Sequence, residues 1–147
     1  MINEKGKLSL LLVEDNEDDV LIARRAFKEF KFISEVHIAR DGQQALDMLS
    51  SPGAAGSPKA LRPSIILLDI TLPLMDGIAL LRRLKADPAL RPIPVIMLTT
   101  SSRDEDVVRS YQNGAASYIT KPASLEEFLE LARRFEMYWV SVSKLPL

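Results

Sequence analysis

The sequence predicts a doubly wound α/β domain, with a parallel sheet of five strands and helices on both faces. Five short apolar runs alternate with segments that carry apolar residues at helical spacing. Four of the five runs are mostly continuous rather than alternating in polarity, which is typical of strands buried on both faces of a parallel sheet. Repeated strand–helix units imply right-handed crossovers, so the helices cover both faces of the sheet.

The strands are expected at residues 8–13, 35–39, 64–68, 94–98 and 117–120. Two segments fit a capping box, Ser102-Arg-Asp-Glu105 and Ser124-Leu-Glu-Glu127, and each predicts the start of a helix. Residues 50–63 hold several prolines and glycines, which exclude helix and strand and predict a long surface loop. Residues 124–147 are expected to form the final helix and an aromatic tail.

Size and composition predict one domain over residues 1–147 and exclude several classes of protein. The formal net charge of −1 lacks the basic excess that nucleic-acid binding requires. The apolar runs are far shorter than the roughly 18 residues of a membrane span. No cysteine is present and no signal peptide is recognisable, so we expect a cytoplasmic protein with neither nucleic acid nor membrane as its partner.

Polar side chains follow the predicted strands, at the edge where doubly wound sheets bind their ligands. They are Glu14 and Asp15 after the first strand, Asp69 after the third, Thr99 and Thr100 at the fourth, and Lys121 after the fifth. Three carboxylates at one edge repel each other unless a cation lies among them, and oxygen donors favour a hard ion such as Mg²⁺. Lys121 adds a fixed positive charge to this expected site.

Four motifs occupy these strand ends in one order along nearly the whole chain. They are Leu11-Leu-Val-Glu-Asp-Asn16, Leu67-Leu-Asp-Ile-Thr-Leu-Pro-Leu-Met-Asp-Gly77, Met97-Leu-Thr99 and Tyr118-Ile-Thr-Lys-Pro122. This pattern resembles the receiver domain of two-component response regulators. The resemblance implies the flavodoxin-like strand order 2-1-3-4-5, a sensor histidine kinase as partner, and Mg²⁺ as cofactor. It also implies a phosphoacceptor rather than an enzyme, with only self-phosphorylation and slow autodephosphorylation.

The resemblance implies a role for each strand-end residue. Asp69 is the expected phosphoacceptor, and the expected metal ligands are Glu14, Asp15, Asp69 and the backbone carbonyl of Thr71. Phosphate binding and switching are assigned to Thr99, Thr100, Lys121 and the aromatic Tyr118. The bond between Lys121 and Pro122 is expected to be cis, as in the family. Glu14 stands where aspartate is more usual, and its extra methylene favours contact with the metal through water.

The long loop and the aromatic tail resemble the small regulators that are paired with bacterial phytochromes. That narrower resemblance implies a phytochrome-type kinase and a homodimer formed through the fourth helix, fifth strand and fifth helix. Leu131 and Tyr138 extend the apolar side of the last helix beyond the roughly 100° arc that faces a core, so we expect them at this contact. The alternative is that they pack under the chain's own tail. The last 24 residues are too few for an output domain, so signalling by protein contact is expected.

Two other classes of protein share part of this pattern. Phosphatases of the haloacid dehalogenase type also use an aspartate nucleophile, but they need a second aspartate two positions on as general acid, where this chain has Thr71. A flavin-binding module needs a phosphate-cradling loop after the first strand, where Glu14, Asp15 and the acidic residues after them would repel the phosphate. The sequence therefore favours the signalling protein.

Overall fold

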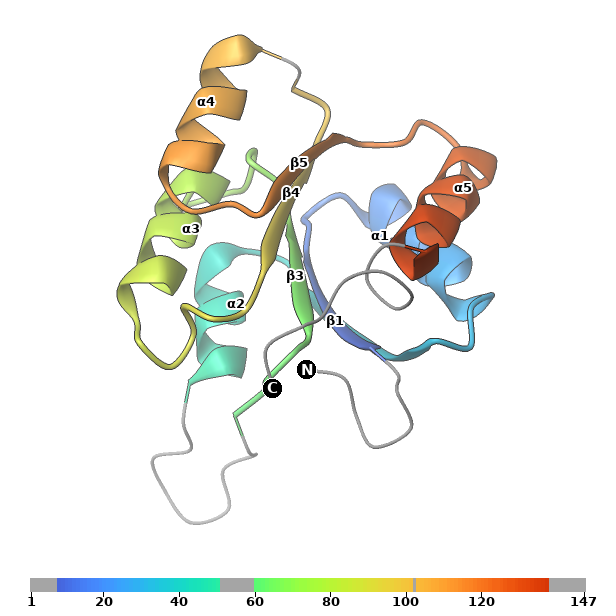
Figure 1. Cartoon of the computed structure of the whole chain (residues 1–147), viewed down its shortest axis with the longest axis horizontal. Helices are drawn as coiled ribbons and strands as arrows, with labels where there is room; N and C mark the ends of the chain where they lie inside the picture. Colours follow the sequence, from blue (N-terminus) through green and yellow to red (C-terminus); the bar gives the residue numbers. More distant parts are fainter. Residues whose placement is uncertain (1–7, 51–59, 102, 138–147) are drawn as a thin grey trace.

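The computed structural model describes residues 8–50, 60–101 and 103–137. Five parallel strands form one sheet in the order β2-β1-β3-β4-β5, which confirms the predicted fold. The strands are β1 (Leu8–Val13), β2 (Ile33–Ala39), β3 (Ile65–Leu68), β4 (Val95–Thr99) and β5 (Ser117–Thr120). The helices are α1 (Glu17–Lys28), α2 (Gly42–Leu49), α3 (Gly77–Ala86), α4 (Asp104–Gln112) and α5 (Leu125–Phe135). Figure 1 shows α1 and α5 on one face of the sheet and α2, α3 and α4 on the other.

Two hydrophobic clusters, one on each face of the sheet, explain why the strand sequences are continuously apolar. In β3, Ile66 and Leu68 belong to the cluster under α2 and α3, and Ile65 and Leu67 belong to the cluster under α1 and α5. All four side chains are fully buried. A strand covered on both faces cannot alternate in polarity, because both sets of its side chains lose contact with water.

The edge strand β2 begins two residues earlier than predicted. Ile33 pairs with Leu8 of β1, and the Leu8 amide donates to the Phe32 carbonyl over 2.7 Å. Most side chains of β2 are only partly buried, because it is an edge strand. Its start is therefore defined by hydrogen bonding to β1 and not by an apolar run. β4 extends one residue further than predicted and includes Thr99.

The helix ends test the two predicted capping boxes. At α5 the prediction is confirmed, because Ser124 Oγ accepts from the Glu127 amide at 3.2 Å and Glu127 Oε2 accepts from the Ala123 amide at 3.0 Å. At α4 the helix begins one residue later than predicted, with Arg103 at the N-cap and no side-chain cap there. Three acidic residues in its first turn favour the positive end of the helix dipole instead.

The predicted loop and tail are described only in part. Of the loop at residues 50–63, the structure describes Ser50 and 60–63, where the Leu61 amide donates to the Met48 carbonyl and Arg62 donates to the Leu49 carbonyl. Tyr138 lies outside the described residues. Within the described part of the chain, no helix has the length and apolar character that crossing a membrane requires.

Candidate functional site

Four side chains from distant parts of the sequence meet at the carboxyl edge of the sheet, and we call them the lysine cluster: Glu14, Asp19, Asp69 and Lys121. The Nζ atom of Lys121 donates to Asp69 Oδ2 at 2.9 Å, to Asp19 Oδ2 at 3.0 Å and to Glu14 Oε1. The Lys121 side chain is only 8% exposed and that of Asp69 only 9%. The predicted meeting of Glu14, Asp69 and Lys121 is therefore found in the structure.

Asp19 was not predicted as part of this site. It lies in the first turn of α1, where its amide donates to the capping side chain of Asn16 at 3.0 Å. In the sequence it appears only as one of several acidic residues after β1. One signal in the sequence could have identified it. The first turn of the helix after β1 starts at the carboxyl edge of the sheet, so an acidic residue there lies close to Glu14 and Asp15.

The charges in the lysine cluster do not balance, because three carboxylates surround one ammonium. Burial raises the pKa of Glu14 to about 7; the negative charge of Asp69 adds to the shift, and the hydrogen bond from Lys121 opposes it. Burial also opposes the charge of Lys121, but its hydrogen bonds to Glu14, Asp69 and Asp19 outweigh this and raise its pKa above the usual lysine value. The site therefore favours the arrival of a further cation.

The backbone around Asp69 is tightly folded. The Asp69 amide donates to the Val13 carbonyl at 3.2 Å, and the Thr71 amide donates to Asp69 Oδ1, also at 3.2 Å. The Gly77 amide donates to the Ile70 carbonyl at 2.7 Å, which closes the loop between β3 and α3. A Cβ atom at position 77 would lie 2.1 Å from the Asp69 carbonyl oxygen, so only glycine permits this approach.

The donor set at this edge fits a hard divalent cation by its chemistry. Asp15 and Thr71 are exposed beside the buried carboxylates, and all the available donors are oxygens. Among the described residues, however, no group of three Asp, Glu, His or Cys side chains is arranged to hold an ion. The ammonium of Lys121 lies among the three carboxylates of its cluster and already pairs with each of them.

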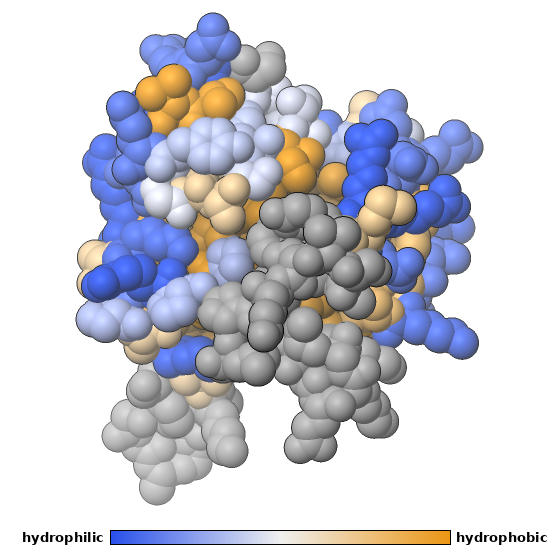
Figure 2. All heavy atoms as spheres, viewed as in Figure 1, coloured by the Kyte–Doolittle hydropathy of each residue, from blue (hydrophilic) through white to orange (hydrophobic). Residues whose placement is uncertain are grey.

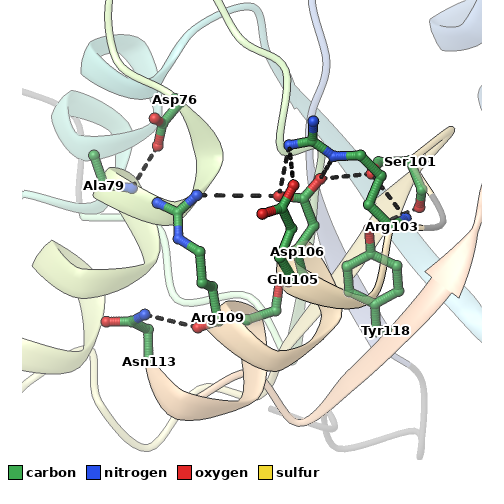
Figure 3. A network of polar contacts seen from close by, with 10 residues as sticks. Asp76, Ala79, Ser101, Arg103, Glu105, Asp106, Arg109, Asn113 and Tyr118 are labelled. Atoms are coloured by element: carbon green, nitrogen blue, oxygen red, sulfur yellow. Dashed lines mark hydrogen bonds and ion pairs between the residues drawn. The ribbon is translucent and has the colours of Figure 1, made fainter.

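A second set of polar contacts, which we call the tyrosine network, joins β5 to the start of α4: Ser101, Arg103, Asp106 and Tyr118 (Figure 3). The Tyr118 hydroxyl donates to the Ser101 carbonyl at 2.7 Å, and Ser101 Oγ donates to Asp106 Oδ2 at 2.6 Å. Arg103 Nε donates to the same carboxylate at 3.3 Å. Hydrogen bonds from Ser101 and Arg103 lower the pKa of Asp106, and burial raises that of Tyr118.

The tyrosine network includes the predicted Tyr118 and three residues that the sequence did not indicate. Thr99 lies beside it, fully buried, with Oγ1 accepting from the Ser101 amide at 3.4 Å. Thr100 follows at the exposed end of β4. Asp106 had no recognisable signal, because a buried aspartate inside an acidic helix start looks like its exposed neighbours.

The predicted cis bond between Lys121 and Pro122 is wrong for this structure, in which no described residue has a cis peptide bond. The trans form is the lower in energy for most bonds to proline, by about 0.5–1 kcal/mol. With the bond trans, Lys121 still reaches its three carboxylates, and its amide donates to the Thr99 carbonyl at 2.7 Å.

A five-stranded doubly wound sheet with a buried aspartate directly after a central strand, paired with a lysine directly after the edge strand, defines a phosphoacceptor domain of the receiver type. The family model described as response regulator receiver domain matches residues 10–133. The chain belongs to this family, whose members are phosphoacceptor signalling domains.

Curated relatives match almost the whole chain. The probable methanogenesis regulatory protein FilR2 of Methanothrix harundinacea is 38% identical over 93% of this chain and 86% of its own length. The response regulator Rcp1 of Synechocystis is 36% identical over 93% of this chain and 92% of its own length.

Solved structures agree with the family and with the fold. The phosphorylated cyanobacterial phytochrome response regulator RcpA is 36% identical and covers 96% of this chain and 99% of its own, with a TM-score of 0.85. The Mn²⁺-bound form of Rcp1 is 35% identical, with a TM-score of 0.80 over 95% of this chain and 99% of its own. The chain is therefore a response regulator receiver domain similar to phytochrome response regulators, and a relative binds a divalent metal.

Proposed function

We propose that this chain accepts a phosphoryl group on Asp69 from the phosphohistidine of a sensor kinase and signals through phosphorylation-dependent contact with another protein. The observation that carries this proposal is the 2.9 Å contact between the Asp69 carboxylate and the Lys121 ammonium inside a nearly buried site. In the reaction an oxygen of Asp69 forms a bond to phosphorus while the bond from phosphorus to the histidine nitrogen breaks. The imidazole leaves, and Lys121 offsets the repulsion between the carboxylate and the phosphoryl oxygens.

Magnesium is the proposed cofactor. The residues that would hold it are Asp15, Asp69 and the carbonyl oxygen of Thr71, with Glu14 acting through water. When bound, it would neutralise the charge that collects on the phosphoryl oxygens. The unbalanced negative charge of the lysine cluster supports this proposal, as does the Mn²⁺ in the structure of Rcp1.

The same residues would hold the product. Lys121 and the hydroxyls of Thr99 and Thr100 are the proposed donors to the phosphoryl oxygens of modified Asp69, because charge-assisted hydrogen bonds to such a group are strong. Thr99 also contacts Ser101, whose carbonyl holds Tyr118, so a movement of Thr99 would reach the aromatic ring. Position 71, two residues after Asp69, holds a threonine rather than an aspartate that could act as general acid, so we propose self-phosphorylation and slow autodephosphorylation rather than turnover of a substrate.

A phytochrome-type histidine kinase is the proposed donor, in the cytoplasm and with no nucleic acid or membrane involved. The support is the similarity to RcpA, described as a phytochrome response regulator, over nearly the full length of both chains. The net charge of −1 gives no electrostatic reason for binding nucleic acid.

A homodimer through α4, β5 and α5 is also proposed. Val108 and Tyr111 of α4 are 52% and 49% exposed, and Figure 2 shows apolar surface between α4 and α5. Next to it is a pocket of about 510 Å³ whose apolar lining includes Ile119, Leu131 and Phe135. Leu131 is half-buried and packs against the core, so it supports this face rather than projecting from it.

The phosphoacceptor is tested by intact mass after incubation with acetyl phosphate and Mg²⁺. We expect wild type to gain one phosphoryl group and Asp69→Asn to gain none. The matched control is Asp76→Asn, because Asp76 is an exposed aspartate after the same strand whose carboxylate caps α3. Equal labelling of wild type and Asp69→Asn would show that the assignment of Asp69 is wrong.

The dimer is tested by sedimentation velocity with and without beryllofluoride. We expect the beryllofluoride complex of wild type to sediment as a dimer, and Val108→Asp to remain monomeric. Val108 is preferred to Leu131 for this test because its side chain is not part of the core. A wild-type chain that stays monomeric in both states would exclude the dimer.

A further inference from the structure

The loop between β3 and α3 presents one apolar side chain entirely to solvent. Leu74 is 98% exposed, more than any other large apolar side chain that the structure describes. Three other apolar residues of the same loop, Ile70, Leu72 and Met75, pack against the core. These three hold the loop in place, so Leu74 is not needed to anchor it.

The backbone at Leu74 is also unfavourable for leucine. Its φ angle is +68°, and among the described residues it is the one non-glycine residue in the left-handed region. The Met75 amide donates to the Pro73 carbonyl at 2.7 Å, which makes a three-residue turn with Leu74 at its tip. Glycine or asparagine adopts such a conformation at lower cost than a bulky side chain. Leu74 thus contributes neither burial nor a favourable conformation to the folded state.

The position of Leu74 determines what can contact it. The loop starts directly after Asp69 and is closed by the hydrogen bond from Gly77 to Ile70, so its tip stays at the carboxyl edge of the sheet (Figure 1). The Asp69 side chain is 9% exposed. A histidine side chain is short, so a protein that delivers its phosphoryl group to Asp69 must bring its own surface onto this edge. A small donor such as acetyl phosphate has no such surface.

We propose that Leu74 is a contact residue for the protein phosphodonor. In the complex its side chain is buried against apolar surface of the donor protein, beside the phosphohistidine. This inference rests on the proposed function of Asp69. Strained residues with exposed apolar side chains are typical of binding sites, where a partner covers them. Exposed carboxylates lie at the same edge, at Asp15 and Asp76, so the complementary surface is apolar with basic groups around it.

The test compares two variants at one position with two kinds of donor. Leu74→Asn suits the turn but removes the apolar side chain, whereas Leu74→Met keeps an apolar side chain of similar size. The donors are acetyl phosphate and a panel of purified, autophosphorylated phytochrome-type histidine kinases, from which the fastest donor to wild type is taken. Met137→Gln serves as control, because it removes an apolar side chain that is 69% exposed just after α5.

We expect Leu74→Asn to accept phosphoryl groups from the kinase about tenfold more slowly than wild type, the size typical of a strong interface contact. Leu74→Met and Met137→Gln should stay close to the wild-type rate. All four proteins should react equally with acetyl phosphate, and the melting temperature of Leu74→Asn should equal or exceed that of wild type. The rate loss would then come from a lost contact and not from a damaged fold.

Three results would overturn the proposal. Leu74→Asn could match the wild-type rate with the chosen kinase, or it could lose stability or acetyl phosphate labelling in parallel. It could also alter the sedimentation of the beryllofluoride form, which would assign Leu74 to a contact with a second copy. Failure of the proposed function is distinguishable, because wild type would then gain no phosphoryl group on Asp69 from any donor.

Discussion

The two halves of the carboxyl edge are built on different physical principles. The lysine cluster, at the ends of β1, β3 and β5 and the start of α1, consists of four ionisable side chains of which only one is a cation. The tyrosine network, between β5 and α4, centres on one buried carboxylate that has neutral and cationic donors around it. One half is therefore sensitive to any change in local charge, whereas the other depends on hydrogen-bond geometry.

This difference suits the two tasks of the proposed function. Metal binding and phosphorylation change the charge next to Asp69, and an unbalanced cluster responds to such a change with new pairings. The tyrosine network holds a carbonyl, a hydroxyl and a carboxylate at hydrogen-bonding distances. A movement of the β4–α4 connection would change these distances and weaken the hydrogen bonds. Thr99 lies between them, since its hydroxyl contacts Ser101 and its carbonyl accepts from Lys121.

The largest expected effect comes from removing the positive charge of the lysine cluster. Lys121→Met should lower the free energy of unfolding at pH 8 by about 3 kcal/mol, because a buried ion pair that loses one partner leaves its carboxylates uncompensated. Added Mg²⁺ should recover more stability in this variant than in wild type, measured as melting temperature with and without the ion.

Lys85→Met is the matched control for that comparison. Lys85 is partly buried, but its Nζ atom donates to the neutral carbonyls of Arg91 and Ile93 at 2.9 and 2.8 Å. Mg²⁺ should not restore its lost stability. Equal recovery of both variants would contradict the view that unbalanced carboxylates attract the ion.

The next effect concerns Asp106. Its pKa in the folded protein lies below the ordinary value of 3.8, so its ionised form stabilises the fold above that pH, and this stabilisation is lost as the pH falls through the folded-state pKa. Asp106→Asn should cost about 1–2 kcal/mol at pH 7. The difference from wild type should shrink in acid, measured by urea unfolding across the pH range.

Glu105→Gln is the control for Asp106, because Glu105 is an exposed neighbour that also pairs with Arg103. Its change should be within about 0.5 kcal/mol at every pH, as for most exposed ion pairs. If Asp106→Asn lowered the free energy of unfolding equally at every pH, packing and not the charge of Asp106 would stabilise the tyrosine network.

A smaller effect is expected at the aromatic end of the tyrosine network. Tyr118→Phe removes the hydroxyl that donates to the Ser101 carbonyl and should cost about 1 kcal/mol. Tyr111→Phe removes only the exposed acceptor of the Tyr118 amide and should cost less. Chemical denaturation of both variants measures the two changes in the free energy of unfolding. A larger decrease in Tyr111→Phe than in Tyr118→Phe would contradict the expected order.

The smallest effect on stability is expected at Thr99, because its hydroxyl makes only a long contact of 3.4 Å. Thr99→Ala should fold with a stability within about 1 kcal/mol of wild type. Its response to beryllofluoride should nevertheless be lost, measured as the chemical-shift change of Tyr118. A normal response would show that Thr99 does not couple the two halves.

Much of the fold and part of the site could be predicted from the sequence. Asp69 and Lys121 stand next to recognisable strands, and the ends of parallel strands meet at one edge whatever the loops do. Asp19 and Asp106 were missed, because each lies in an acidic helix start where one carboxylate turns inward and its neighbours do not. Leu74 looks like an ordinary apolar residue until its backbone angle and exposure are known.

The sequence by itself determined the number and direction of the strands, because continuous apolar runs at regular intervals have few other ways to become buried. It also determined that Glu14, Asp69 and Lys121 share one edge. Only the tertiary structure decided which partners they have: Lys121 joins three carboxylates that lie 52 to 107 residues away, and its bond to Pro122 is trans. Such pairings depend on distances of a few tenths of an ångström between side chains, and these follow from packing rather than from local sequence.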